Sequence, residues 1–213
     1  MEARSVGARE ADVAPAPDPT PAAWTPANPA PLGLFGFAAT TFVLSVLNAN
    51  LVGPAGSGVV LGFALAYGGI AQLLAGMWEF RTGNTFGAVA FSSYGAFWIS
   101  VYILLNVAPK GSFNEAGFSL YLYSWTIFTV LMLIASLRTT GALALVFLVL
   151  AITFLLLAIG HASLTGTQTT NGTIKLGGWL GIITAIAAWY TGLAALLTST
   201  FGREVLPVFP LGR

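Results

Sequence analysis

Six long runs without a charged residue constrain this 213-residue chain more than any other feature. Each run is about 19 to 24 residues long, which as a helix spans roughly 30 Å and matches the hydrocarbon core of a bilayer. A closed barrel is the other way to cross a membrane, but these runs are too long and too continuously apolar for alternating strands. The sequence therefore predicts an all-α integral membrane protein, a bundle of six transmembrane helices. The runs are Leu32–Val52, Val59–Trp78, Asn84–Leu105, Phe118–Leu137, Ala142–Gly160 and Leu176–Ser199.

Composition limits the function classes. Hydrophobic residues make up 56% of the chain and charged residues 7%, whereas about a quarter of an average soluble protein is charged. The net charge is +1 and the basic residues are scattered, so no nucleic-acid partner is expected. With no cysteine and one histidine, we expect no metal site and no other cofactor. Because the runs contain no titratable residue of the Asp, Glu, Lys, Arg or His type, acid–base catalysis is disfavoured and an enzyme is not expected.

Proline content and charge divide and orient the chain. Residues 1–27 are rich in proline and are expected to form a disordered cytoplasmic tail, residues 28–208 the six-helix domain, and residues 209–213 a short cytoplasmic tail. Basic residues collect on the cytoplasmic side of membrane proteins, and with the N-terminus inside six arginines lie there against two lysines outside. Both termini are therefore predicted to be cytoplasmic. The arginines are Arg4, Arg9, Arg81, Arg138, Arg203 and Arg213, and the lysines are Lys110 and Lys175.

The segment Asn28-Pro29-Ala30-Pro31-Leu32-Gly33-Leu34 stands at the head of the first run. Proline lacks a backbone donor and fixes φ, so this segment enters or begins a helix. Asn28 is a natural N-cap, whose side chain accepts hydrogen bonds from first-turn amides. Asn84 or Thr85 is expected to cap the third helix in the same way. If these two helix starts lie side by side, their partial positive charge marks an entry for a small anion, and if they lie apart, they are simply helix ends.

Two further patterns lie around the second run. Glu79 and Arg81 follow it directly, where water or each other can satisfy their charges. Small residues recur at every fourth position within three of the runs, and such faces let helices approach closely, either inside one bundle or between protomers. These residues are Gly58, Gly62 and Ala66, then Ala88, Ser92, Ala96 and Ser100, then Gly177, Gly181 and Ala185.

Several separate motifs, in order along the chain, resemble one known family. They are Asn28–Leu34, Gly68–Gln72, Gly83–Phe86 with Phe91, Ser93–Gly95 with Phe97 and Trp98, and Phe201–Arg203 with Val205–Pro207. Together these residues resemble the acetate uptake transporter family over about residues 27–208. The resemblance implies six-helix protomers that assemble as homohexamers in the plasma membrane. It also implies that each protomer has its own path for acetate and related short monocarboxylates, and in some members for succinate.

The resemblance also implies a narrow hydrophobic constriction at Phe37, Tyr94 and Leu150. All three lie in helices predicted to run outward, about five to ten residues past the helix starts, so their depths agree to roughly 8 Å and they can form one ring. A ring of this kind selects by size and by the cost of wetting, and a tyrosine hydroxyl offers one hydrogen bond to a carboxyl group.

Polar residues within the runs either join helices or line a path. Asn48 and Asn50 cannot both point the same way on a helix, so at least one of them is expected to be structural. The polar residues are Thr40, Thr41, Asn48, Asn50, Gln72, Ser92 and Ser93.

The sequence thus predicts a membrane channel or transporter for acetate and related monocarboxylates, possibly with succinate, that conducts through each protomer. The alternative is a channel for neutral small solutes such as urea, ammonia or undissociated acids, which an apolar ring also suits. Since the runs hold no Asp, Glu or His, we expect no proton site on the protein itself. Substrate is then expected to cross either as the undissociated acid or as the anion.

Overall fold

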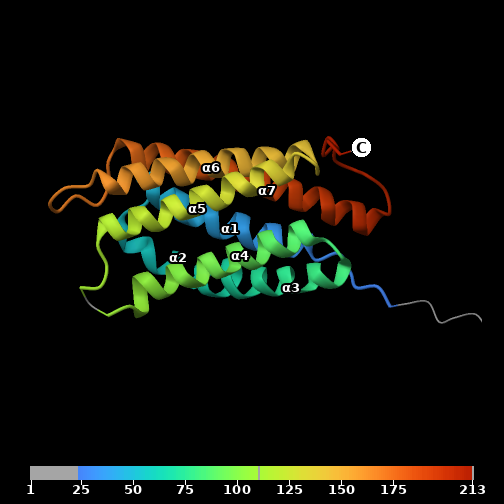
Figure 1. Cartoon of the computed structure of the whole chain (residues 1–213), viewed down its shortest axis with the longest axis horizontal. Coiled ribbons are helices and arrows are strands. Elements are labelled where there is room, and N and C mark those ends of the chain that lie inside the picture. Colours follow the sequence, from blue (N-terminus) through green and yellow to red (C-terminus); the bar gives the residue numbers. More distant parts are fainter. Residues whose placement is uncertain (1–23, 110, 213) are drawn as a thin grey trace, which may run out of the picture.

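The computed structural model describes residues 24–109 and 111–212, and the described chain is a single helical bundle (Figure 1). Six helical segments are long and apolar enough to cross a membrane, so the six-helix prediction is confirmed. The predictions for residues 1–23 of the disordered tail, for Lys110 and for Arg213 fall outside the described residues. The segments are Ala30–Asn48, Pro54–Thr82, Thr85–Val107, Glu115–Ser136, Gly141–Ala162 and Gly172–Phe201.

Seven α-helices make up these six segments, because the second is interrupted. They are α1 (Ala30–Asn48), α2 (Ser57–Leu65), α3 (Gln72–Thr82), α4 (Thr85–Tyr102), α5 (Glu115–Ser136), α6 (Gly141–Ala162) and α7 (Gly172–Phe201). A π-helical turn, Ala66–Ala71, joins α2 to α3, and another, Ile103–Val107, extends α4.

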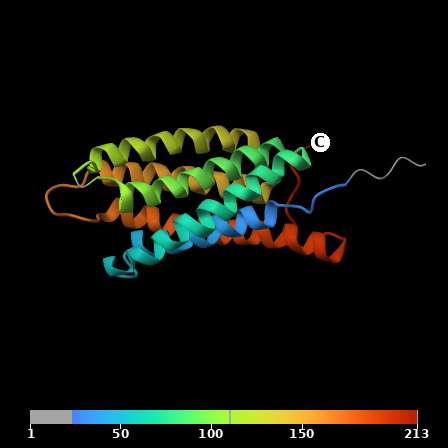
Figure 2. The same cartoon turned by 90° about the horizontal axis from the view of Figure 1, so that it is seen from below.

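The helices run along the long axis of the molecule, and both views place the two described chain ends at the same end of the bundle (Figure 1 and Figure 2). We call this end the termini side and the opposite end the far side. The starts of α1, α4 and α6 lie on the termini side, and the start of α5 and the end of α6 lie on the far side. Helix α1 packs against α7, α3 and the first π-helical turn, α3 packs against α4, and α5 and α7 flank α6.

The helices extend beyond the uncharged runs, which corrects one prediction. Glu79 lies inside α3, Glu115 begins α5, and His161 lies in the last turn of α6. Long helices carry these residues because their other faces are apolar enough to hold the segment in the bundle. The long helices therefore carry titratable side chains just past the ends of the uncharged runs.

Glycines allow the interrupted second segment to approach α1 closely. A Cβ built on Gly68 would lie 2.5 Å from Thr40 Oγ1, and one on Gly36 would lie 2.7 Å from the Tyr67 carbonyl oxygen. Thr40 in turn donates to the Gly36 carbonyl at 2.8 Å. The wider π-helical turn changes the direction of the side chains that follow it, and Gln72 is the first of these.

The small-residue faces divide between inner and outer positions. Gly177 and Gly181 pack against α6 and α1, and Ser92 packs against Gly76 of α3. In contrast, a Cβ on Gly58 or Gly62 would meet nothing within 4 Å in the described chain. Two of the three faces thus serve packing inside the bundle, and the face of α2 is exposed.

Residues 207–211 return to the start of α6. Gly141 donates its backbone N–H to the Phe209 carbonyl at 2.7 Å, and Ala142 donates to the Val208 carbonyl at 3.2 Å. On the other side of this contact, Tyr190 donates its hydroxyl to the Pro207 carbonyl at 2.7 Å. We call residues 207–211 the strap. It supplies two of the acceptors that the first amides of α6 need.

Candidate functional site

Two cavities enter the bundle from its opposite ends. The termini-side cavity has a volume of about 80 Å³ and is lined by α1, α3, α4 and α6. The far-side cavity has a volume of about 470 Å³ and is lined by α1, α4, α5 and α6. Phe37 and Leu150 line both cavities, so the two spaces are separated by these side chains.

The structure brings the three predicted ring residues together. Phe37, Tyr94 and Leu150 are all buried, and the rings of Phe37 and Tyr94 have centroids 5.6 Å apart. Tyr94 lines the termini-side cavity only. Its ring also packs against Phe128 and Phe147, which come from α5 and α6. Aromatic contacts from three helices therefore fix the Tyr94 side chain at the junction of the cavities.

The Tyr94 hydroxyl already has a hydrogen-bond partner within the bundle. It lies 2.8 Å from Thr129 Oγ1, and Thr129 donates its own proton to the Trp125 carbonyl at 2.7 Å. Tyr94 must then be the donor to Thr129. The hydrogen bond that this hydroxyl is predicted to offer a carboxyl group can therefore only be one that it accepts, through its remaining lone pair.

The Asn28–Leu34 motif is distributed over three surfaces. Ala30 and Leu34 line the termini-side cavity, Gly33 lies under the ring of Phe91, and Leu32 is exposed. Pro31 is buried within the first turn, where its missing N–H leaves no donor unpaired. Of the seven residues, only two therefore contribute side chains to the termini-side cavity.

The two predicted caps behave differently. Asn84 caps α4 by accepting the Gly87 N–H at 3.1 Å, and it lines the termini-side cavity, whereas Thr85 is exposed and lines neither cavity. The N-cap of α1 is Pro29, so Asn28 lies one residue too early to be the cap. Its side chain accepts only the Ala30 N–H, at 3.0 Å. Ala30 and Gly87 line the same cavity, so the starts of α1 and α4 do converge there.

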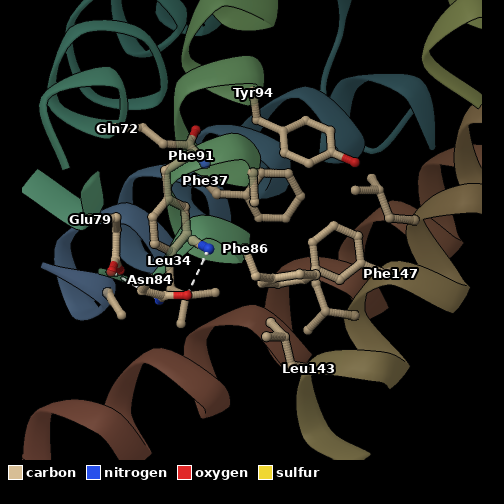
Figure 3. A pocket seen from close by; sticks show the side chains of 15 residues that line it. Leu34, Phe37, Gln72, Glu79, Asn84, Phe86, Phe91, Tyr94, Leu143 and Phe147 are labelled. Carbon is tan, nitrogen blue, oxygen red and sulfur yellow. Dashed lines mark hydrogen bonds between the residues drawn. The ribbon is translucent and has the colours of Figure 1, made fainter. Parts of the chain in front are cut away.

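Glu79 is the residue that the sequence analysis placed wrongly. Its side chain is buried, lines the termini-side cavity and makes no ion pair with Arg81 (Figure 3). Instead, Glu79 Oε2 accepts from Asn84 Nδ2 at 2.9 Å and from Thr82 Oγ1 at 3.1 Å. The overlooked signal is its spacing from Gln72, because residues seven apart share one face of a helix.

The predicted polar residues separate into lining and packing positions. Thr41 and Asn48 line the far-side cavity, and Gln72 lines the termini-side cavity. Thr40 and Ser92 fill close helix contacts instead, and Ser93 lines neither cavity. Asn50 follows the end of α1 with φ +60°, a conformation that asparagine tolerates better than most residues, so it is the structural member of the Asn48 and Asn50 pair.

The far-side cavity contains polar groups that the sequence analysis missed. His161 Nδ1 lies 2.7 Å from Glu115 Oε2, and both residues line this cavity. Among the described residues, Trp98 Nε1 and Thr41 Oγ1 are buried without a hydrogen-bond partner, and both side chains line the same cavity. An indole N–H can only donate. The wall of this cavity thus contains an unpaired donor.

Comparison with known proteins shows the family of this chain. The model of the GPR1/FUN34/yaaH family matches residues 11–213. The chain is 45% identical over 198 residues to acetate permease A of Emericella nidulans, covering 85% of this chain and 65% of that protein. It is 40% identical over 186 residues to the succinate-acetate/proton symporter SatP of Escherichia coli, covering 85% of this chain and 95% of that protein.

A solved structure also matches. The bacterial acetate channel SatP aligns with a TM-score of 0.78 and 37% sequence identity, over 86% of this chain and 99% of that one. The fold, the six membrane segments and the family model agree, so the chain is an integral membrane protein and belongs to the GPR1/FUN34/yaaH family.

Proposed function

We propose that this protein conducts acetate and related small monocarboxylates across a membrane, through a path inside each protomer. The observation that carries the proposal is the pair of cavities that enter from opposite ends and meet at Phe37 and Leu150. Some relatives align with this chain over most of their length, and one of these is named a succinate-acetate/proton symporter. That name supports carboxylates as the transported substrates. Succinate is a further substrate under this proposal. Catalysis is no part of the proposed function.

In this proposal Phe37, Tyr94 and Leu150 form the constriction. Buried apolar side chains in a narrow path raise the cost of wetting and reject bulky or strongly hydrated solutes. The termini-side cavity admits only small molecules, since about 80 Å³ accommodates roughly five waters. The starts of α1 and α4, with Ala30 and Asn84, form its mouth.

Flux into proteoliposomes tests this function directly. Purified protein should carry labelled acetate faster than protein-free vesicles and should carry glycerol no faster. Acetate flux equal to that of protein-free vesicles would remove the proposed function.

A second candidate is conduction of neutral small solutes. The apolar ring favours it, and one relative, 44% identical over 181 residues, is the ammonia transport outward protein 2 of Saccharomyces cerevisiae. The same vesicles should then carry ammonia or urea faster than acetate. The relative rates decide between the two candidates.

We propose that the termini side faces the cytoplasm of a plasma-membrane protein. Arg81, Arg138 and Arg203 lie on the termini side and Lys175 on the far side, and basic residues favour the cytoplasmic face. The access of a membrane-impermeant thiol reagent to single cysteines placed at Ser112 or Glu204 would test this orientation in intact cells.

We further propose that protomers assemble as a homohexamer through the exposed face of α2. Gly58 and Gly62 have open space at their Cβ positions, and small residues at four-residue spacing let another helix approach closely. Gly62→Leu should shift the mass of the native assembly toward smaller species. Leu120→Ala, at an exposed position of α5, is the control and should leave that mass unchanged.

A further inference from the structure

The carboxyl group of Glu79 has one oxygen in use and one without a partner. Only 1% of the residue is exposed, and Oε2 accepts from Asn84 and Thr82. Among the described residues, no group donates to the buried Oε1. Figure 3 shows the carboxyl group beside Asn84 in the wall of the termini-side cavity. A buried oxygen of this kind is unfavourable until something donates a hydrogen bond to it.

No basic side chain lies in this cavity to pair with Glu79. Among the fifteen residues that line it, none is basic. Arg81 is exposed and lies over the ring of Trp24, 6.0 Å from its centroid. On the helices packed against α3, the titratable groups are tyrosines, and the one that lines the cavity, Tyr94, donates its proton to Thr129. Glu79 therefore faces the path without a counter-ion.

The other polar groups of the termini-side cavity add acceptors. Gln72 Oε1 is buried without a partner in the described chain, two helical turns before Glu79 on the same face. Tyr94 keeps only an acceptor lone pair. An acetate anion that entered this cavity would meet a carboxyl group and acceptor oxygens, and two carboxylates at hydrogen-bond distance cannot both stay ionised.

A carboxyl group and a carboxylate can instead share one proton, as the paired aspartates of acid proteases do. Building on the proposed function, we propose that Glu79 binds the substrate as a carboxyl–carboxylate pair that holds one proton between substrate oxygen and Glu79 Oε1. Acetic acid with ionised Glu79, and acetate with protonated Glu79, contain the same atoms and the same charge. When the substrate leaves as the acid, it takes the proton along and Glu79 returns to its starting state.

The consequence is electroneutral transport of one proton with each carboxylate, through a residue on the protein. This replaces the expectation that no protein group takes part. An acetate anion that crosses alone carries charge through the membrane field, so 100 mV can change its rate up to about fiftyfold. Acetate that crosses together with a proton carries no net charge, so its rate does not depend on the voltage.

Glu79→Gln is the discriminating variant. The amide oxygen can still accept from Asn84 and Thr82, and its N–H₂ can donate to an acetate anion, but it cannot hold the proton. Labelled acetate flux is measured in proteoliposomes at equal pH on both sides, with a potassium gradient and valinomycin to set the potential. Glu204→Gln is the matched control, because Glu204 is an exposed carboxylate on the termini side and lines neither cavity.

We expect wild type and Glu204→Gln to change their acetate flux less than twofold over 100 mV and to alkalinise the side that loses acetate. Glu79→Gln should keep acetate counterflow, which moves no net charge, and its net flux should become at least fivefold dependent on voltage. Voltage-dependent flux in wild type, or electroneutral flux in a Glu79→Gln protein that retains counterflow, would overturn the pair. Voltage-dependent flux in wild type would overturn the pair even if the variant fails to fold. Wild-type flux no faster than that of protein-free vesicles would remove the proposed function itself.

Discussion

The two cavities differ in the hydrogen bonds that they leave unmade. The far-side cavity has an unpaired donor at Trp98 Nε1 and a histidine beside Glu115. The termini-side cavity has unpaired acceptors at Glu79 Oε1 and Gln72 Oε1. A carboxylate suits the first set and a carboxylic acid suits the second. Under the proposed function, a substrate would change its hydrogen-bonding role, and not only its position, when it passes the ring.

The largest effect should come from removing the barrier between the cavities. Leu150→Ala should raise the flux of four-carbon monocarboxylates relative to acetate by about tenfold, equivalent to about 1.4 kcal/mol off the barrier, because it opens the junction. Competition between labelled acetate and butyrate in vesicles measures the ratio. Leu148→Ala is the control, since Leu148 is on the same helix but 45% exposed on its outer face. Equal ratios in the two variants would remove Leu150 from the constriction.

The next effect tests the donor in the far-side cavity. Trp98→Phe removes an indole N–H that has no partner in the described chain, so acetate entering from that side should bind about fivefold more weakly, for a hydrogen bond worth about 1 kcal/mol. Initial rates over a range of acetate concentrations give the apparent KM. Trp179→Phe, on an exposed position of α7, should leave the KM unchanged. An unchanged KM in Trp98→Phe would show that the donor does not contact substrate.

A third prediction compares helix caps on the two sides. Asn84→Ala removes the cap of α4 and a donor to Glu79, and should lower the free energy of unfolding by about 2 kcal/mol. Asn114→Ala removes only the cap of α5 on the far side, and should cost about 1 kcal/mol. Denaturant unfolding in detergent measures both. Equal losses would mean that the bond from Asn84 to Glu79 contributes nothing to stability.

The smallest effect is expected at Asn28. Its single bond to the Ala30 N–H is exposed, so Asn28→Ala should cost only about 0.5 kcal/mol and change acetate flux less than twofold. The same unfolding and flux assays apply. A loss of flux beyond fivefold in a folded Asn28→Ala protein would give this side chain a direct part in the path.

The sequence predicted the membrane segments well because their signal is physical and local. An uncharged run of about 20 residues admits few other structures, so only the helix ends shifted, for instance from Val59 to Pro54 in the second segment. The meeting of Phe37, Tyr94 and Leu150 at one depth was expected from the family resemblance and from their distances past the helix starts. Their assignment as the constriction is still a prediction.

The polar half of the site could not be predicted in the same way. Glu79 was read as a solvated charge because it follows the uncharged run, but α3 continues through it and buries it against α4. The His161 and Glu115 contact joins residues 46 positions apart, and spacing in the sequence gives no information about it. The contact of the Tyr94 hydroxyl with Thr129 was not foreseen, because Thr129 lies on a different helix. Each error depends on which helices are neighbours.

The strap has a consequence for the order of synthesis. The first amides of α6, those of Gly141 and Ala142, find acceptors at Phe209 and Val208, 68 and 66 residues later in the chain. A ribosome must therefore complete the sixth membrane segment and release these residues before the fifth segment has all its bonds. Until then, the Thr140 side chain, which accepts the Leu143 N–H at 3.2 Å, is the cap that α6 has at its start. A reporter domain fused after the strap would pull on the strap and, through these hydrogen bonds, on the start of α6. A fusion at that end would therefore perturb the cavity wall although it is attached outside the bundle.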